Sequence, residues 1–141
     1  MENPIFQPYI TGKEFSVDLY LDKNGKSKGC IVRRRDLIEN GESQISTVIE
    51  NKKIEKICLE IVKKIKFHGH IVFQIILDKK NKVNIIECNC RFGGASTLSL
   101  ASGLDSFYWF LLEVKKQDLN KQPFLSTSNK KQIRYHKDLI I

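Results

Sequence analysis

Two apolar runs separated by a short polar turn constrain the fold of this chain more than any other part of its sequence. The runs are "HIVFQIIL" (70–77) and "KVNIIECN" (82–89), and "DKKN" lies between them. Apolar runs of this length with a polar break predict a β-hairpin. We place a two-residue turn at Lys80 and Asn81, which sets the register of the two strands.

In this register Gln74 lies opposite Glu87, and Val72 lies opposite Asn89. Because side chains alternate across a strand, the three polar side chains share one face of the hairpin. The predicted members of that face are Val72, Gln74, Ile76, Ile85, Glu87 and Asn89. The predicted members of the opposite face are Phe73, Ile75, Leu77, Ile86 and Cys88.

The polar face gathers amide and carboxylate oxygens at the end of an otherwise apolar strand. Burying such groups without partners costs a few kcal/mol each, by order of magnitude. A hard cation that takes oxygen ligands, such as Mg²⁺, would remove that cost, and it commonly binds together with substrate phosphates. The alternative is a polar strand end at the rim of the domain, with Glu87 bonded to Arg91.

The rest of the chain predicts an α+β fold, with a mostly antiparallel β-sheet and helices packed on one face. Alternating apolar residues predict strands, and "KNGK" and "ENGE" predict tight turns between them. Helical spacing predicts the two helical regions, and the aromatic stretch 107–110 is predicted to be core. The predicted strands are 13–22, 27–35, 43–50 and a closing strand at 132–141, and the predicted helical regions are 50–67 and 97–116.

Length and charge limit the class of protein. A chain of 141 residues forms one domain at most. The sequence has no apolar run long enough to span a membrane and no signal-peptide pattern, so we expect a cytoplasmic protein without a membrane partner. The net charge of +8 favours polyanions, but the lysines are dispersed, so we do not expect nucleic-acid binding.

The cysteines do not follow the spacing of a zinc site. Two of them form a C-x-C pair, and no second pair or histidine cluster accompanies it. We therefore expect free, buried thiols at Cys30, Cys58, Cys88 and Cys90.

Several segments together resemble the ATP-grasp superfamily, in its biotin-carboxylase-like and carbamoyl-phosphate-synthase-like branch. "IIECNCRFGG" is similar to the family's E-x-N-x-R segment, and "FQPYITGKEFSVDLYL" is similar to its adenine hinge and ribose strand. "GHIVFQIILD" resembles the strand with the first metal ligand, and "IRYHKDLII" resembles the closing strand. The resemblance covers nearly the whole chain, in the family's order.

The resemblance implies a role for each matched position. Gln74, Glu87 and Asn89 match ligands of Mg²⁺ (or Mn²⁺), and Arg91 matches the arginine that steadies the transferred phosphate. Glu87, Asn89 and Arg91 are therefore the predicted catalytic residues. The predicted ATP-binding residues are Gln7, Pro8 and Ile10 in the hinge, Glu14 at the ribose, Ile76 at the adenine, and Arg33 and Arg35 near the phosphates. A solvated edge strand is the alternative for the two arginines.

Three positions depart from the family pattern without removing a necessary group. Gln7 replaces a glutamate in the hinge, Gln74 replaces a commoner acidic ligand, and Cys90 stands where proline is usual. We also expect that the subdomain with the phosphate-binding lysines and the glycine-rich flap is absent, because no such segment precedes the hinge. The expected organisation is the C-terminal half of an ATP-grasp domain over 1–141, with the hinge at 1–12 and a loop and closing strand at 117–141.

The implied function is the ATP- and Mg²⁺-binding catalytic half of a ligase that joins a carboxylate to an amine or ammonia through an acyl-phosphate, in the manner of carbamoyl-phosphate synthase. Its expected partners are ATP, the small substrates and the missing N-terminal half, without which we expect no activity. The alternative is a degenerate module that binds nucleotide or a partner without turnover. Glycines 93 and 94 would let backbone amides approach the substrate.

Overall fold

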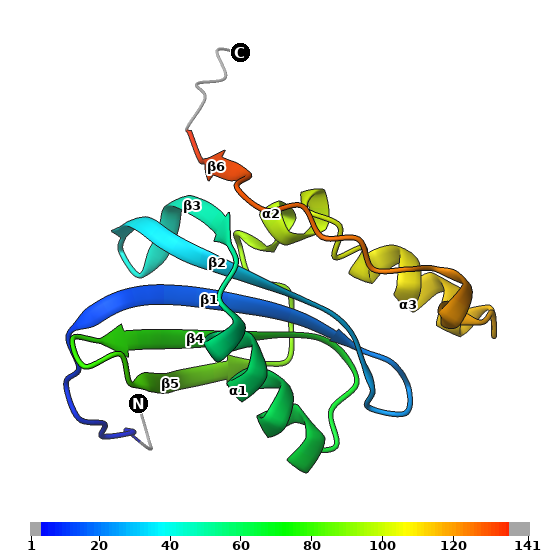
Figure 1. The fold of residues 1–141 in the computed structure, drawn as a ribbon, viewed down its shortest axis with the longest axis horizontal. Helices are drawn as coiled ribbons and strands as arrows, with labels where there is room; N and C mark the ends of the chain where they lie inside the picture. The colour runs from blue at the N-terminus through cyan, green and yellow to red at the C-terminus, as the bar shows by residue number, and fades with distance from the viewer. Residues whose placement is uncertain (1–3, 136–141) are drawn as a thin grey trace.

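The computed structural model describes residues 4–135, which form one antiparallel sheet with three α-helices (Figure 1). The spatial order of the strands is β5-β4-β1-β2-β3-β6. The strands are β1 (Gly12–Leu21), β2 (Ser27–Glu39), β3 (Glu42–Ile49), β4 (Gly69–Asp78), β5 (Val83–Asn89) and β6 (Lys131–Ile133). The helices are α1 (Lys52–Lys64), α2 (Ser96–Ala101) and α3 (Ser106–Val114), with a short 3₁₀ turn, η1 (Leu119–Lys121). The fold class is therefore confirmed.

Tight turns at the predicted positions connect the first three strands. In the β2–β3 turn, Asn40 and Gly41 both have positive φ, at 51° and 78°. Those dihedrals are the ones a two-residue hairpin turn requires, and Asn-Gly is the dipeptide that adopts them most readily. In the β1–β2 turn, Asp22 accepts hydrogen bonds from the backbone N–H of Asn24 (2.9 Å) and Lys26 (2.8 Å).

The β4–β5 hairpin pairs Gln74 with Glu87 and Val72 with Asn89, as predicted. Its turn is longer than predicted. Leu77 pairs with Val83, and Asn81 within the turn has a positive φ of 59°. A β-bulge between Gln74 and Ile75 then restores the register further along the hairpin.

The predicted position of Ile85 on the polar face is therefore wrong. Ile85 pairs with Ile75 and packs against the main apolar core. The extra residue of the bulge is Ile86, which has no paired residue on β4.

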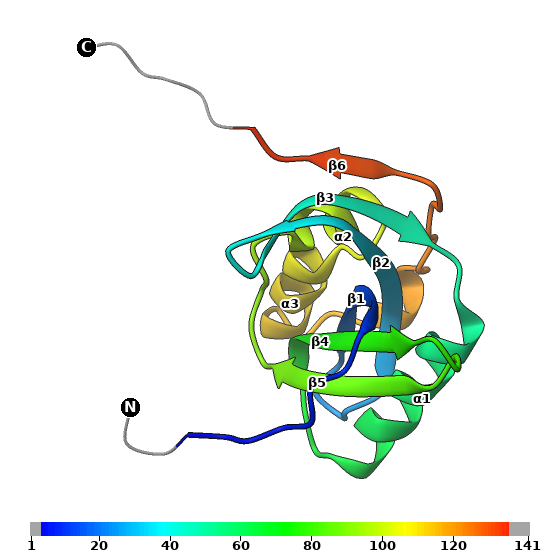
Figure 2. The same ribbon diagram turned by 90° about the vertical axis from the view of Figure 1, so that its left-hand side faces the viewer.

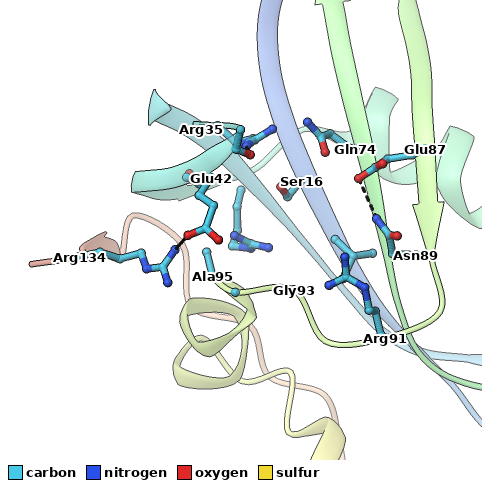
Figure 3. Close-up of a pocket in the computed structure, with 15 residues that line it drawn as sticks. Ser16, Arg35, Glu42, Gln74, Glu87, Asn89, Arg91, Gly93, Ala95 and Arg134 are labelled. Carbon is cyan, nitrogen blue, oxygen red and sulfur yellow. Dashed lines mark hydrogen bonds and ion pairs between the residues drawn. The ribbon is translucent and has the colours of Figure 1, made fainter. Parts of the chain in front are cut away.

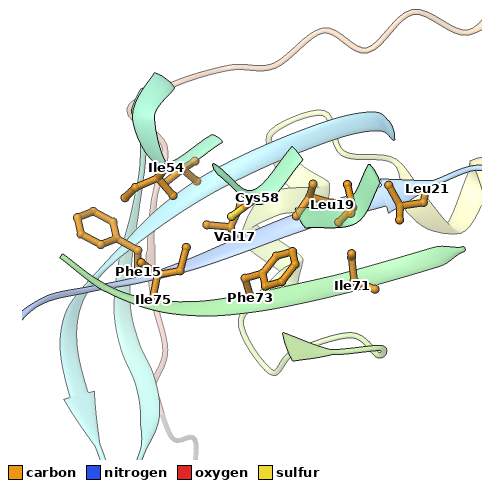
Figure 4. Close-up of a cluster of buried hydrophobic side chains, with 11 residues drawn as sticks. Phe15, Val17, Leu19, Leu21, Ile54, Cys58, Ile71, Phe73 and Ile75 are labelled. Carbon is orange, nitrogen blue, oxygen red and sulfur yellow. The ribbon is translucent and has the colours of Figure 1, made fainter. Parts of the chain in front are cut away.

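The larger core lies between the sheet and α1. Phe15, Val17 and Leu19 of β1 point toward this face, where Ile54, Cys58 and Val62 of α1 cover them (Figure 4). Asn51 begins the helix by accepting a hydrogen bond from the N–H of Ile54 at 3.1 Å, which satisfies one of the free donors of the first turn.

The second core lies on the opposite face of the sheet, under α2 and α3. It joins Tyr20, Ile31 and Val48 from the strands to Leu98 of α2 and Trp109 of α3. Figure 2 shows the sheet curling around α2 and α3, whereas α1 lies outside. The prediction that both helical regions pack on one face is wrong. Successive residues of a strand point to opposite faces of the sheet, and apolar residues on each face form a core, one with α1 and the other with α2 and α3.

Other predictions are confirmed only in part. Within the aromatic stretch 107–110, only Trp109 is buried, so the prediction that the stretch is core holds for that residue and is wrong for the other three. All four cysteines are free, but Cys88 and Cys90 are exposed. The closing strand is observed as β6, paired with β3, while 136–141 lies outside the described residues. Among residues 4–135, no helix is both long enough and apolar enough to cross a membrane.

Candidate functional site

A row of polar side chains crosses the sheet on the face that carries α2 and α3. Ser16 of β1 pairs with Arg33 of β2 on one side and with Gln74 of β4 on the other. Gln74 in turn pairs with Glu87 of β5. Because directly paired residues point to the same face, four strands place these side chains in a line.

Hydrogen bonds join the metal-ligand candidates to one another. Asn89 Nδ2 donates to Glu87 Oε1 at 2.8 Å (Figure 3). With its amide oriented so that both ends are satisfied, Gln74 donates to Glu87 Oε1 at 2.9 Å and accepts from Arg35 NH1. The hairpin register thus brings together the three side chains that the sequence predicted would share a face.

These side chains line one pocket together with segments distant in sequence. The β2–β3 turn closes one side, and the loop that leads from β5 into α2 forms another (Figure 3). The lining residues are Ser16, Arg33, Arg35, Gly41, Glu42, Ser43, Val72, Gln74, Glu87, Asn89, Arg91, Gly93, Gly94, Ala95 and Arg134. The predicted residues Arg33, Arg35, Gln74, Glu87, Asn89 and Arg91 therefore meet in one place.

Arg35 links this pocket to the predicted ribose carboxylate. Its NH1 donates to Glu14 Oε2 at 2.8 Å, and its NH2 donates to the carbonyl oxygen of Gly41 at 2.6 Å. Burial lowers the pKa of Arg35, and the nearby Glu14 carboxylate opposes that change. The edge-strand alternative for Arg33 and Arg35 is wrong, because β2 is an interior strand and both side chains are buried.

The predicted adenine-binding residues lie outside the pocket, near the edge strand β5. Gln7 donates from Nε2 to the carbonyl oxygen of Ile86, the bulged residue, at 3.1 Å. Pro8 is exposed and Ile10 is half-buried, in an irregular segment before β1. Ile76 is half-buried and pairs with Glu14 on one side and with Asn84 on the other.

Arg91 is exposed in the loop after β5 and donates to the carbonyl oxygen of Phe92 at 3.3 Å. Within residues 4–135 there is no ion pair between Glu87 and Arg91, so the alternative of a bonded pair at the strand end is wrong. Phe92 anchors the loop by stacking between His70 and Phe107, with ring centroids 4.1 Å apart in both contacts.

A buried ionic network centred on Asp18 lies beside the pocket, and the sequence did not reveal it. The Asp18 carboxylate binds Arg33 through its Nε and NH2, both at 2.7 Å. It also accepts hydrogen bonds from Ser96 and Ser99 of α2, the second at 2.9 Å, and His70 Nε2 lies 3.1 Å away. The exposed fractions of Asp18 and Arg33 are 0% and 1%.

The partners of Asp18 decide its charge state. Burial alone would raise the pKa of the carboxyl, but the Arg33 guanidinium and hydrogen bonds from His70 and Ser96 outweigh it and hold the pKa well below its usual range. Asp18 is therefore a carboxylate that ties β1 to β2, β4 and α2. A charged residue within the apolar run "VDLYL" is the only local sign of this network.

The ligand chemistry of the polar row suits Mg²⁺. Gln74 and Asn89 offer amide oxygens and Glu87 offers a carboxylate, which are the hard oxygen ligands that this ion prefers. Residues 4–135 contain no cluster of three or more His, Cys, Asp or Glu side chains placed to hold a metal. Three side chains leave part of the coordination shell of Mg²⁺ to other ligands, commonly water and substrate phosphates. A cation here would also compete with Arg35 for the oxygen of Gln74.

Solved structures with the same fold include two biotin carboxylases and the ATPase subunit of another carboxylase. Biotin carboxylase from Campylobacter jejuni, described as a β,γ-ATP complex, is 20% identical with a TM-score of 0.63 over 74% of this chain and 25% of that chain. The biotin carboxylase domain of Hydrogenobacter thermophilus 2-oxoglutarate carboxylase, described with MgADP, ADP and bicarbonate, is 17% identical with a TM-score of 0.65 over 87% and 29%.

The phosphoribosylaminoimidazole carboxylase ATPase subunit of Aquifex aeolicus is 20% identical with a TM-score of 0.62 over 75% of this chain and 33% of that chain. This chain thus spans a quarter to a third of the length of these proteins. A comparison with curated protein sequences found no match.

The chain shares the fold of a subdomain of these biotin carboxylases. Residues 1–139 match the family described as "ATP-grasp in the biosynthetic pathway with Ter operon". The chain belongs to this ATP-grasp family.

Proposed function

We propose that this chain is the ATP- and Mg²⁺-binding catalytic half of a carboxylate–amine or carboxylate–ammonia ligase of the carbamoyl-phosphate-synthase-like type. One observation carries the proposal: Gln74, Glu87, Asn89 and Arg91 line a single pocket in a chain of the ATP-grasp family. The description of related folds with β,γ-ATP and with MgADP and bicarbonate supports the nucleotide and the metal.

In the proposed reaction, an oxygen of the substrate carboxylate attacks the γ-phosphorus of ATP and ADP leaves. The amine or ammonia nitrogen then attacks the acyl carbon, loses a proton, and phosphate leaves. Bound Mg²⁺ (or Mn²⁺) supplies positive charge for the phosphate oxygens, and Gln74, Glu87 and Asn89 would hold it. Arg91, exposed at the pocket wall, would donate to the transferred phosphate.

The remaining predicted residues would hold the rest of the nucleotide. Arg33 and Arg35 would supply positive charge near the phosphates, and Glu14 would bind the ribose hydroxyls. Gln7, Pro8 and Ile10, in a hinge over 1–12, would contact the adenine together with Ile76 of β4. We further propose that the partner is an N-terminal subdomain with the phosphate-binding lysines, which would cover the exposed side of the pocket.

Binding of Mn²⁺ together with ADP tests the proposal on this chain, with the relaxation enhancement of water protons as the readout. Glu87→Ala should abolish the enhancement while circular dichroism stays unchanged, because Glu87 is exposed at the end of an edge strand and its removal leaves no cavity. The matched control is Glu55→Ala on α1, which lies on the other face of the sheet and should bind normally. Normal Mn²⁺–ADP binding by Glu87→Ala would refute the metal assignment.

The alternative of a non-catalytic module makes a different prediction. The chain would then bind Mn²⁺ and ADP in the same way, but it would form no amide when an ATP-grasp N-terminal half is supplied. Reconstituted ligase turnover that Glu87→Ala abolishes would exclude this alternative.

A further inference from the structure

The end of the pocket opposite the metal-ligand candidates has a different chemistry. Figure 3 shows Gln74, Glu87 and Asn89 on one side and Arg134 with Glu42 on the other. Arg134 NH1 donates to Glu42 Oε2 at 2.8 Å, and its guanidinium lies within van der Waals distance of the Cβ position at Gly94. One end of the pocket therefore holds the three candidate oxygen ligands, and the other holds a guanidinium that is paired with the Glu42 carboxylate.

Two buried arginines reach this pocket with hydrogen-bond donors to spare. Arg33 uses Nε and NH2 on Asp18, and among the described residues its NH1 has no partner. Arg35 uses NH1 and NH2 on Glu14 and Gly41, and its Nε is likewise without a partner within residues 4–135. Both side chains are more than nine-tenths buried, and both line the pocket.

Leaving a buried, charged donor unpaired is costly, so such a donor is evidence of an absent partner. Arg33 lies beside the turn that opens α2, because its partner Asp18 also binds Ser96 and because Ser96 accepts from the N–H of Gly93 at 2.9 Å. Arg134 approaches the same turn at Gly94. Arg33 and Arg134 thus line the same pocket next to this turn, where a bound anion could accept from both.

We propose that this end of the pocket binds a second anionic group, a carboxylate or a phosphate, carried by the substrate whose reacting carboxylate lies at Arg91. This inference rests on the proposed ligase function. It defines the substrate class as a dianion with a non-reacting acidic group. Glu42 pairs with Arg134 when no anion is bound, and it would be displaced by the second group.

Calorimetric titration of the chain, at fixed ionic strength and without nucleotide or metal, tests the proposal. The probes are malonate, succinate and glutarate, each against the monocarboxylate of equal carbon number, together with phosphoglycolate. At least one dianion should bind about tenfold more tightly than its monoanionic counterpart, as expected for one charge-assisted hydrogen-bonded contact. Phosphoglycolate above succinate would indicate a phosphate as the second group, and the reverse order would indicate a carboxylate.

Three variants locate the effect. Arg134→Gln and Arg33→Lys should remove the preference for dianions, the second because lysine keeps the charge beside Asp18 but has a single nitrogen in place of the planar guanidinium with its separate NH1 group. The matched control is Arg34→Gln, because Arg34 lies between Arg33 and Arg35, pairs with Asp36 and does not line the pocket. It should keep the preference.

Equal binding of dianions and monoanions by the unmodified chain would overturn the proposal. A similar loss in Arg34→Gln would also overturn it, since the effect would then be one of general charge. Glu87→Ala separates this proposal from the proposed function. Loss of Mn²⁺–ADP binding in Glu87→Ala with the dianion preference intact supports both. A preference for dianions in a chain that never binds Mn²⁺–ADP supports the anion site alone.

Discussion

Asp18 and Arg33 form an ion pair that is removed from solvent on both sides, close to the candidate site. The energy of such a pair depends on how completely its remaining donors and acceptors are satisfied, because removal of the two charges from water is expensive. His70, Ser96 and Ser99 complete the hydrogen bonding of Asp18. The NH1 group of Arg33 is the exception, because it has no partner among the described residues, and Arg33 lines the pocket of the proposed anion site.

Replacing Asp18 by asparagine should destabilise the chain severely. The change leaves the buried guanidinium of Arg33 without its counter-charge, which costs about 3–5 kcal/mol. The measurement is the free energy of unfolding in urea. The matched control is Asp36→Asn, which breaks a pair whose arginine is exposed and should cost about 1 kcal/mol or less. Similar losses in the two variants would contradict the network described here.

The free energy of unfolding should decrease as the pH is lowered, because Asp18 then becomes protonated in the unfolded chain. The folded pKa of Asp18 is well below its usual value, so the unfolded chain takes up the proton first as the pH drops. The stabilising contribution of Asp18 is complete above the pKa of the unfolded chain and is lost as the pH falls toward the folded pKa, so the decline begins at about pH 5. The ¹³C carboxyl signal of Asp18 should stay that of a carboxylate at pH 3. Titration of that signal near pH 4 would contradict the assignment.

The sequence predicted the metal-ligand candidates better than the network beside them. Gln74, Glu87 and Asn89 follow from strand alternation within one hairpin, so their common face needs only local geometry. Asp18 and Ser96 are 78 residues apart in the sequence, and the periodicity of apolar residues within one strand or helix does not predict a contact at that separation. Arg134 reaches the pocket for the same reason, through the docking of β6 on β3.

At the scale of elements, the glycines with positive φ differ sharply in their surroundings. Gly41 in the β2–β3 turn has φ +78° and open space where a Cβ would lie. Gly103, between α2 and α3, has φ +103°, and an added Cβ would meet the carbonyl oxygen of Leu125 at 2.1 Å. The segment 125–127 lies against the backbone of Ser102 and Gly103, because Thr127 N–H donates to the carbonyl oxygen of Ser102 at 3.0 Å.

Alanine at these two glycines should therefore have unequal effects on thermal unfolding. Gly41→Ala should cost about 1–2 kcal/mol, which is the strain of a left-handed backbone for an L-residue. Gly103→Ala should cost about 3 kcal/mol or more, because the same strain adds to a backbone clash that cannot relax locally. Equal losses of stability in the two variants would mean that the backbone at Leu125 and Ser126 shifts away from an added Cβ at little cost.

The existence of the helices was predictable, whereas the face on which each one packs was not. A 3.6-residue period shows that α1 has a buried side, but it does not say which side of the sheet receives it. In α3 the period is obscured by apolar residues all round, and Phe107, Phe110, Leu111 and Val114 are exposed. The bulge at Ile86 could not be predicted either, since it compensates for a turn that is one residue longer than the predicted one.

At the scale of the whole molecule, the pocket is an open surface on one face of a sheet. The chain spans 25% to 33% of the solved proteins that share its fold and are described above. Phosphoryl transfer depends on charge neutralisation and on exclusion of water, and both require the nucleotide to be enclosed. The polar row by itself supplies ligands and positive charge on one side only.

The chain alone should therefore form no acyl-phosphate from Mg²⁺–ATP. We expect ADP release to stay at the level of a protein-free blank, measured by a coupled assay with succinate and ammonia present. Glu87→Ala serves as the control for contaminating ATPases, because it should give the same rate as the unmodified chain. Turnover that this variant abolishes would show that one half is sufficient for chemistry.

The bulge at Ile86 has a consequence for how this chain can vary. It restores Glu87 to the position opposite Gln74 although the turn is one residue longer than predicted, and the carbonyl group of the bulged residue receives Gln7. The hairpin tip, residues 79–81, is exposed and lies beyond the bulge. Insertions and deletions at the tip should therefore be tolerated in relatives without displacing the ligand row, and the tip is a suitable place to insert an affinity tag or a fluorophore.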